Sequence, residues 1–165
     1  MDPLATLSAA ISRIREPRLF STERGYQGHL AAELDKLLEG EPDSIARPLV
    51  EEEYQKTAEK HGIALRPDIV VHIPFERGVS PTRQHDNYLV ILLKLSGTKK
   101  DAIEDFNKLE TICSVLKYPA GVFVNIATSD LWLPNYARKR AREFTLYEIA
   151  VQLHDGVPKL SVAAQ

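Results

Sequence analysis

The sequence predicts a single α/β domain in which helices cover a central sheet. Amphipathic helical patterns at residues 23–40 and 98–117 flank three successive strand patterns. Residues 87–95 are apolar on both faces, as in a central strand buried between helices. At 165 residues and 44% hydrophobic, the chain can bury one core, which favours one domain over two.

The core elements follow in the order helix, three strands, helix, strand. A short helix is expected from Asp2-Pro3 to Pro17, and a second follows Ser21 and Thr22 and ends near Gly40. Strands are expected at residues 46–54, 66–73 and 87–95, with a polar loop at 74–86 between the second and the third. A helix at 98–117 leads into a fourth strand at 120–127.

The C-terminal part adds a basic segment and a hairpin to this core. Residues 134–144 are expected to form a short basic helix that begins near Pro134, and residues 144–164 a hairpin that turns at Asp155-Gly156. The chain therefore divides into an N-terminal helix (1–17), a core (21–127), and a basic helix with a hairpin (128–165).

Composition excludes several classes of function. No apolar run has membrane-spanning length and residues 1–17 do not resemble a secretory leader, so we expect a soluble, cytoplasmic protein. Cys113 is the single cysteine, and the five histidines lack metal-ligand spacing, so neither a disulfide nor a zinc site is expected. The net charge of -2 confines any nucleic-acid binding to a local patch.

Polar residues stand at unusual places in the predicted core. Asp68 heads one apolar strand, and Lys94 lies inside the next. Glu23 and Gln27 continue the apolar stripe of the preceding helix, on the face that should point to the core. His72 shares the strand face of Asp68 by the period-two alternation, as a core histidine or as part of a cleft.

These residues resemble the motif of the restriction-endonuclease-like, or PD-(D/E)XK, nuclease superfamily. Pro67-Asp68 matches its first part, Lys94 its lysine, and Glu23 with Gln27 its helical acid and polar neighbour. The resemblance spans residues 21–127 and implies an αβββαβ core with a mixed sheet. It further implies hydrolysis of DNA phosphodiesters with Mg²⁺, in which Asp68 binds the metal and Lys94 assists the attacking water.

Leu92 departs from the family pattern, because it stands where the second metal-binding acid belongs. Leucine offers no oxygen ligand, so the site is either degenerate or rebuilt with another acid. The resemblance suggests a donor on the following helix, Glu104 or Glu110; Glu53 on the neighbouring strand and Glu23 are further donors. A third explanation is that Leu92 is an introduced substitution.

Each of these features also has a purely structural interpretation. Asp68 and Lys94 would then form a buried ion pair that sets strand register. Glu23 would be an acid favoured at the start of a helix by the helix dipole, and Gln27 would be an exposed amide. The glutamates at 51–53 would be the edge of an exposed strand.

The basic run has two interpretations as well. Arg138, Lys139 and Arg142 occupy neighbouring helical positions and are candidate DNA-phosphate contacts, or they form a solvated helix face.

The sequence thus favours a nuclease-fold protein that acts on or binds DNA, with a divalent-metal hydrolysis site that is degenerate or rebuilt. The alternative is a catalytically inactive nuclease-like binding or scaffold subunit, held in a homodimer or a larger assembly by the N-terminal helix and the C-terminal hairpin. An unrelated α/β protein with a structural ion pair is the third class.

Overall fold

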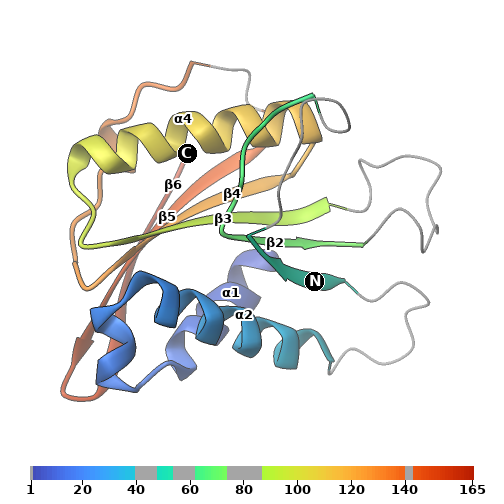
Figure 1. Cartoon of the computed structure of the whole chain (residues 1–165). Coiled ribbons are helices and arrows are strands. Elements are labelled where there is room, and N and C mark those ends of the chain that lie inside the picture. Colours follow the sequence, from blue (N-terminus) through green and yellow to red (C-terminus); the bar gives the residue numbers. More distant parts are fainter. Residues whose placement is uncertain (1, 40–47, 54–61, 74–86, 140–142) are drawn as a thin grey trace.

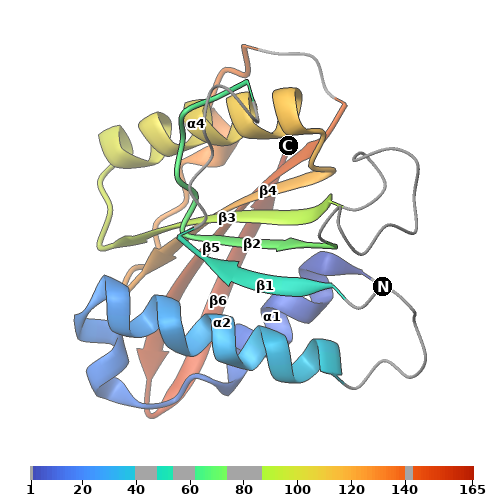
Figure 2. The same cartoon turned by 45° about the vertical axis from the view of Figure 1, so that its right-hand side comes forward.

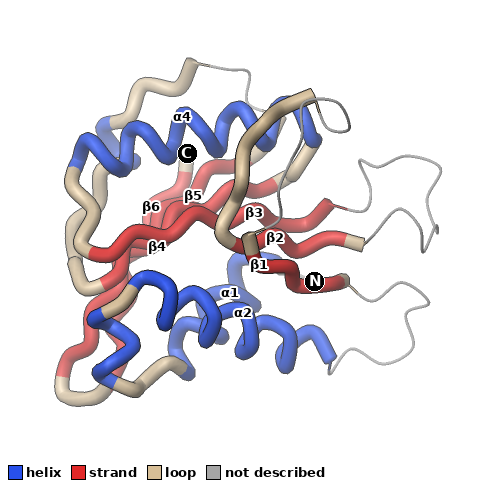
Figure 3. The backbone as a smooth tube through the Cα atoms, in the orientation of Figure 1, coloured by secondary structure: helices blue, strands red, loops and turns tan. Residues whose placement is uncertain are grey.

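The structure, a computed structural model, describes residues 2–39, 48–53, 62–73, 87–139 and 143–165. Its central feature is a mixed six-stranded sheet with the order β1-β2-β3-β4-β5-β6. Helix α4 covers one face of the sheet, and helices α1 and α2 cover the other (Figures 1 and 3). The predicted α/β class with helices on both faces is confirmed.

Helices α1 (Pro3–Arg13) and α2 (Glu23–Glu39) form the layer on one face, joined by a 3₁₀ turn, η1 (Pro17–Ser21). Asp2 caps α1, because its carboxylate accepts hydrogen bonds from the backbone N–H groups of Leu4 at 3.0 Å and Ala5 at 3.3 Å. The predicted stripe of α2 is buried against the sheet; it comprises Leu30, Leu34 and Leu38. The expected end of this helix at Gly40 lies outside the described residues.

The strands are β1 (Leu49–Glu52), β2 (Ile69–His72), β3 (Asn87–Leu95), β4 (Ala120–Ile126), β5 (Thr145–His154) and β6 (Val157–Ala164). The pairs β1–β2, β2–β3 and β5–β6 are antiparallel, whereas β3–β4 and β4–β5 are parallel. Figure 2 shows β1 to β4 stacked in order between the two helix layers. The predicted polar loop at 74–86 lies outside the described residues.

Helix α4 (Lys99–Leu116) makes the crossover from β3 to the parallel β4. It begins at a capping box: the Thr98 hydroxyl accepts from the Asp101 N–H, and the Asp101 carboxylate accepts from the Thr98 N–H. Phe106 and Leu109 are fully buried against the sheet. The expected packing of this helix across the sheet is therefore confirmed.

The two C-terminal expectations have different outcomes. The hairpin is confirmed, with Asp155 (φ 51°) and Gly156 (φ 72°) in the left-handed turn between β5 and β6. The prediction of a basic helix at 134–144 is wrong for the described part of that range: a 3₁₀ turn, η4 (Leu133–Asn135), is followed by residues 136–139 without regular structure, while residues 140–142 lie outside the described residues. The reason is tertiary, because the Lys139 N–H donates to the Glu110 carboxylate on α4 instead of to a carbonyl of its own segment.

None of the helices in the described ranges combines the length and apolarity that crossing a bilayer requires.

Candidate functional site

The pairing of β2 with β3 brings Asp68 next to Leu92. Ile69 pairs with Ile91 and Val70 with Val90, so one further step places Asp68 opposite Leu92. Leu92 faces α4, and the period-two alternation places Lys94 on the same face as Leu92. Asp68, which immediately precedes β2, and Lys94 on β3 therefore lie on the same face, as expected, with leucine at the position between them.

Two carboxylates accept hydrogen bonds from backbone N–H groups of β3, in the part of β3 that extends beyond the first residue of β2. β2 begins at Ile69, so no β2 residue lies opposite Leu93 or Leu95. The Leu93 N–H donates to Oδ2 of Asp68 at 2.7 Å, and the Leu95 N–H donates to Oε2 of Glu23 at 3.0 Å. These bonds fix both acids at one corner of the sheet.

Gln27 and Glu53 fix the backbone at the same corner. The Gln27 side chain donates from Nε2 to the backbone carbonyl of Asp68 at 3.1 Å, and the Glu53 N–H donates to the same carbonyl at 2.8 Å. Gln27 is buried, so the interpretation as an exposed amide is wrong. Gln27 thus connects α2 to Asp68, and Glu23 connects the same helix to β3 at Leu95.

Burial raises the pKa of Asp68 from 3.8 to about 6. The hydrogen bond from the Leu93 N–H lowers this pKa, the negative charges of Glu23 and Asp105 raise it, and the charge of Lys94 lowers it. Asp68 is therefore a carboxyl group that changes its charge close to neutral pH.

Packing and a turn hold the stem of Lys94. A Cβ atom added to Gly97 would lie 2.9 Å from Cγ of Lys94, so only glycine fits beside the stem without a shift. Asn125, which pairs with Lys94 in the β3–β4 register and is fully buried, clamps this glycine. Its Oδ1 accepts from the Gly97 N–H at 2.8 Å, and its Nδ2 donates to the Gly97 carbonyl at 3.1 Å.

The described contacts of Lys94 include no carboxylate within 4.0 Å. Asp68 and Lys94 therefore act on each other through space, and the interpretation of the two as a direct ion pair that sets strand register is wrong.

Three of the expected replacement acids, Glu104, Glu110 and Glu53, have ion-pair or hydrogen-bond partners away from Asp68. The Glu104 side chain is 56% exposed and lies 3.9 Å from Lys100. Glu110 is buried, but it is engaged by the Lys139 N–H at 3.1 Å and by Arg138. The Glu53 carboxylate contacts Arg66.

Asp105 belongs to the segment 105–109, which resembles the polar helix behind such sites in the nuclease superfamily, but it was not among the expected replacement acids. It is buried, its Oδ1 accepts from Nζ of Lys108 at 2.6 Å, and its charge contributes to the raised pKa of Asp68. Lys108 has a raised pKa, chiefly from this bond and to a smaller extent from the charge of Asp68. The signal was present: Asp105 lies three residues after Ala102 and four before Leu109, on the buried stripe of the helix.

A groove of about 410 Å³ runs beside Lys108, between α4 and the segment that leads into β2. Its lining is mostly apolar and comprises Ile63, Ala64, Leu65, Asn107, Lys108 and Thr111.

Within the described ranges, no three His, Cys, Asp or Glu side chains converge closely enough to hold a metal ion. Asp68 keeps one oxygen free of the Leu93 bond, while Leu92 contributes no ligand. The described side chains at this corner therefore do not by themselves make up a complete set of Mg²⁺ ligands.

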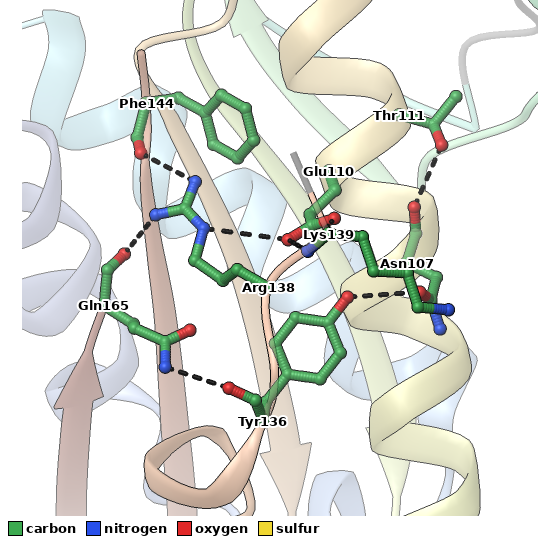
Figure 4. A network of polar contacts seen from close by, with 8 residues as sticks. All are labelled: Asn107, Glu110, Thr111, Tyr136, Arg138, Lys139, Phe144 and Gln165. Carbon is green, nitrogen blue, oxygen red and sulfur yellow. Dashed lines mark hydrogen bonds and ion pairs between the residues drawn. The ribbon is translucent and has the colours of Figure 1, made fainter. Parts of the chain in front are cut away.

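The predicted DNA-contacting cations have different environments (Figure 4). Arg138 is 5% exposed; it donates to the backbone carbonyls of Gln165 at 2.9 Å and Phe144 at 3.2 Å, and its Nε lies 3.6 Å from Glu110. The expectation of an exposed phosphate contact is therefore wrong for Arg138. Lys139 is exposed, and Arg142 lies outside the described residues.

His72 is half-buried and contacts the neighbouring edge strand. A register shift separates it from Val71, and its Nε2 lies 2.5 Å from Oε2 of Glu51 on β1.

Comparison of the chain with protein-family models, with curated proteins and with solved structures finds no match.

Proposed function

We propose that this protein has a restriction-endonuclease-like core and acts on or binds DNA at the corner formed by Asp68, Glu23 and Lys94, where a phosphodiester-hydrolysis site has lost one metal-binding carboxylate. The observation that supports this proposal is the register of β2 and β3. Extended by one residue beyond the pair of Ile69 with Ile91, it puts Leu92 opposite Asp68 and two residues from Lys94, where a second acid would complete the set.

The site as it stands is degenerate. A divalent cation bound between two carboxylates would polarise the phosphate and lower the pKa of a bound water. Asp68 is the carboxylate in place for that role, and burial holds its pKa near 6, so part of the population is protonated just below neutral pH. We therefore expect the protein to bind Mg²⁺ only at millimolar concentration and to cleave DNA slowly or not at all.

Restoring the acid tests this function directly. Leu92→Glu should create Mg²⁺ binding at least about tenfold tighter than that of the wild type in calorimetry, because it supplies the missing oxygen ligand. The same variant should gain Mg²⁺-dependent cleavage of plasmid or single-stranded DNA. Lys94→Ala in this background should remove cleavage and leave DNA binding largely intact.

Leu92→Gln is the matched control, because it has nearly the same shape and size as glutamate but no charge. Both variants place a polar group at a buried position, so their unfolding curves should be measured together. A folded Leu92→Glu protein that neither binds Mg²⁺ more tightly nor cleaves DNA would refute the proposed site.

The position of Asp105 supports a second version of this proposal, in which Asp105 replaces the missing metal-binding carboxylate. Its buried carboxylate raises the pKa of Asp68, so it lies close enough to Asp68 to act on its charge. If it replaces the missing ligand, the wild type should bind Mg²⁺ and Asp105→Asn should abolish binding. Glu104→Gln, on the exposed side of the same helix, should leave it unchanged.

A catalytically inactive binding or scaffold subunit is the second candidate function. The lack of a metal-holding group within the described ranges favours it. In that case the wild type should bind DNA or a protein partner equally well with EDTA and with Mg²⁺.

A further inference from the structure

Strand β6 forms one edge of the sheet and presents an unpaired row of backbone groups. It pairs only with β5 along Val157–Ala164. Leu146 and Gln165 exchange both backbone hydrogen bonds, at 3.0 and 2.9 Å, at the end of this ladder. Because bonded and non-bonded pairs alternate in an antiparallel ladder, Val157, Lys159, Ser161 and Ala163 direct their backbone groups to β5.

The intervening residues therefore direct their backbone groups away from the sheet. Leu160, Val162 and Ala164 each offer an N–H and a carbonyl on this outer side, and Pro158 offers a carbonyl alone. No hydrogen bond reaches these outer groups from any residue that the structure describes. The outer side of β6 is thus an open pairing edge from Leu160 to Ala164.

The side chains of β6 do little to protect this edge. Lys159 is the one charged residue in the sequence of the strand, and Val162 is 46% exposed. Natural proteins protect open edges with charge, proline or shortness. The opposite edge strand, β1, has four residues and ends in acidic side chains, whereas β6 carries Pro158 and Lys159 near its start and neither charge nor proline from Leu160 to Ala164. An edge of this kind is suited to pairing with another strand.

We propose that β6 pairs antiparallel with β6 of a second copy of this chain, about a two-fold axis at Val162. In this register Val162 lies opposite Val162 of the second copy, and Leu160 lies opposite Ala164 of the second copy. All three outward residues then exchange hydrogen bonds, and the two sheets become one continuous sheet.

The sequence of β6 supports a second copy as the occupant, because the strand is complementary to itself in this register. The exposed Val162 side chains cover each other across the axis, as cross-strand pairs do. Lys159 lies opposite Gln165 of the second copy, so no like charges meet. Pro158, which lacks an N–H, lies beyond the bonded region. This inference does not depend on the proposed function.

The oligomeric state is the first test. Analytical ultracentrifugation of the full chain from about 1 to 100 μM should show a monomer–dimer equilibrium. Val162→Pro removes only an outward N–H, which an edge strand tolerates, and should raise the dimer dissociation constant at least about tenfold. Val162→Lys should do the same, because it places two like charges opposite each other.

Val157→Lys is the matched control, since Val157 is exposed to a similar extent, at 42%, but lies outside the paired region. It should leave the dimer unchanged. A wild type that stays monomeric at 100 μM would overturn the proposal. So would a dimer that Val157→Lys weakens as strongly as Val162→Lys, because the association would then be a nonspecific apolar contact.

A crosslink tests the register itself. The Cα atoms of a hydrogen-bonded antiparallel pair lie about 5.5 Å apart, within the range that a disulfide spans. Val162→Cys should therefore form a disulfide-linked dimer under mild oxidation, whereas Ser161→Cys, opposite Ala163 of the second copy, should not. The native Cys113 is buried and does not interfere. Efficient crosslinking of Ser161→Cys and none of Val162→Cys would refute the two-fold axis at Val162.

Discussion

At the residue scale, Gly97 shows how the site depends on a close approach of the backbone. It lies between the stem of Lys94 and the buried amide of Asn125, which bonds to both its N–H and its carbonyl. The position of Lys94 inside an apolar strand marked it as a candidate site residue in the sequence. The two hydrogen bonds between Asn125 and Gly97 were not predicted. Asn125 lies 28 residues beyond Gly97, and local patterns carry no information about such a contact.

Gly97→Ala should destabilise the protein by about 1–3 kcal/mol, because the added Cβ would push against Lys94 and the Asn125 amide. Urea unfolding followed by circular dichroism measures this loss. Gly28→Ala is the control, since its nearest atom, Oε2 of Glu52, is 3.8 Å away and alanine favours a helix interior by about 1 kcal/mol. Equal destabilisation by both substitutions would contradict the close approach at Gly97.

At the element scale, the segment after η4 shows why a basic run does not have to form a surface helix. The spacing of its cations fits a helix, yet Arg138 lies over the Phe144 ring, 4.6 Å from its centroid, and bonds to two strand-end carbonyls. Its partners are Phe144, just before β5, Gln165, just after β6, and Glu110 on α4, so the competing contacts are tertiary. Helices and strands with strong periodic patterns were predicted correctly because burial against the sheet reinforces those patterns.

Arg138→Met should cost about 3–5 kcal/mol in the free energy of unfolding, because it leaves the buried Glu110 carboxylate without its cation. The neighbouring Lys139→Met, which removes an exposed cation, should change it by less than about 0.5 kcal/mol. Urea denaturation of both variants gives the comparison. If both variants change the free energy of unfolding by the same small amount, the basic run would instead be a solvated surface segment.

At the scale of the whole molecule, two buried acids give the stability a common pH dependence. Burial raises the pKa of Asp68 to about 6 and also raises the pKa of the fully buried Glu148, whose Oε2 accepts from the N–H groups of Trp132 and Leu133. An acid with a raised folded pKa binds its proton more tightly in the folded state. The free energy of unfolding should therefore fall as the pH rises from about 4 through about 6.

For Asp68 this loss should be on the order of 2 kcal/mol. Asp68→Asn should remove that part of the dependence between pH 4 and 7 in urea titrations, while the part due to Glu148 remains. If Asp68→Asn and the wild type show the same pH profile, then Asp68 titrates near its ordinary pKa.

The strand order also has a consequence for how the chain folds. Every strand pairs with its neighbour in the sequence, so the sheet can grow one strand at a time as the chain leaves the ribosome. The β5–β6 hairpin, with its two-residue turn, is the most local pair and can close within microseconds. Helix α1, the first of the described elements, nevertheless packs against β6, the last of them. Its apolar face can therefore make its final contacts only after β6 has been synthesised.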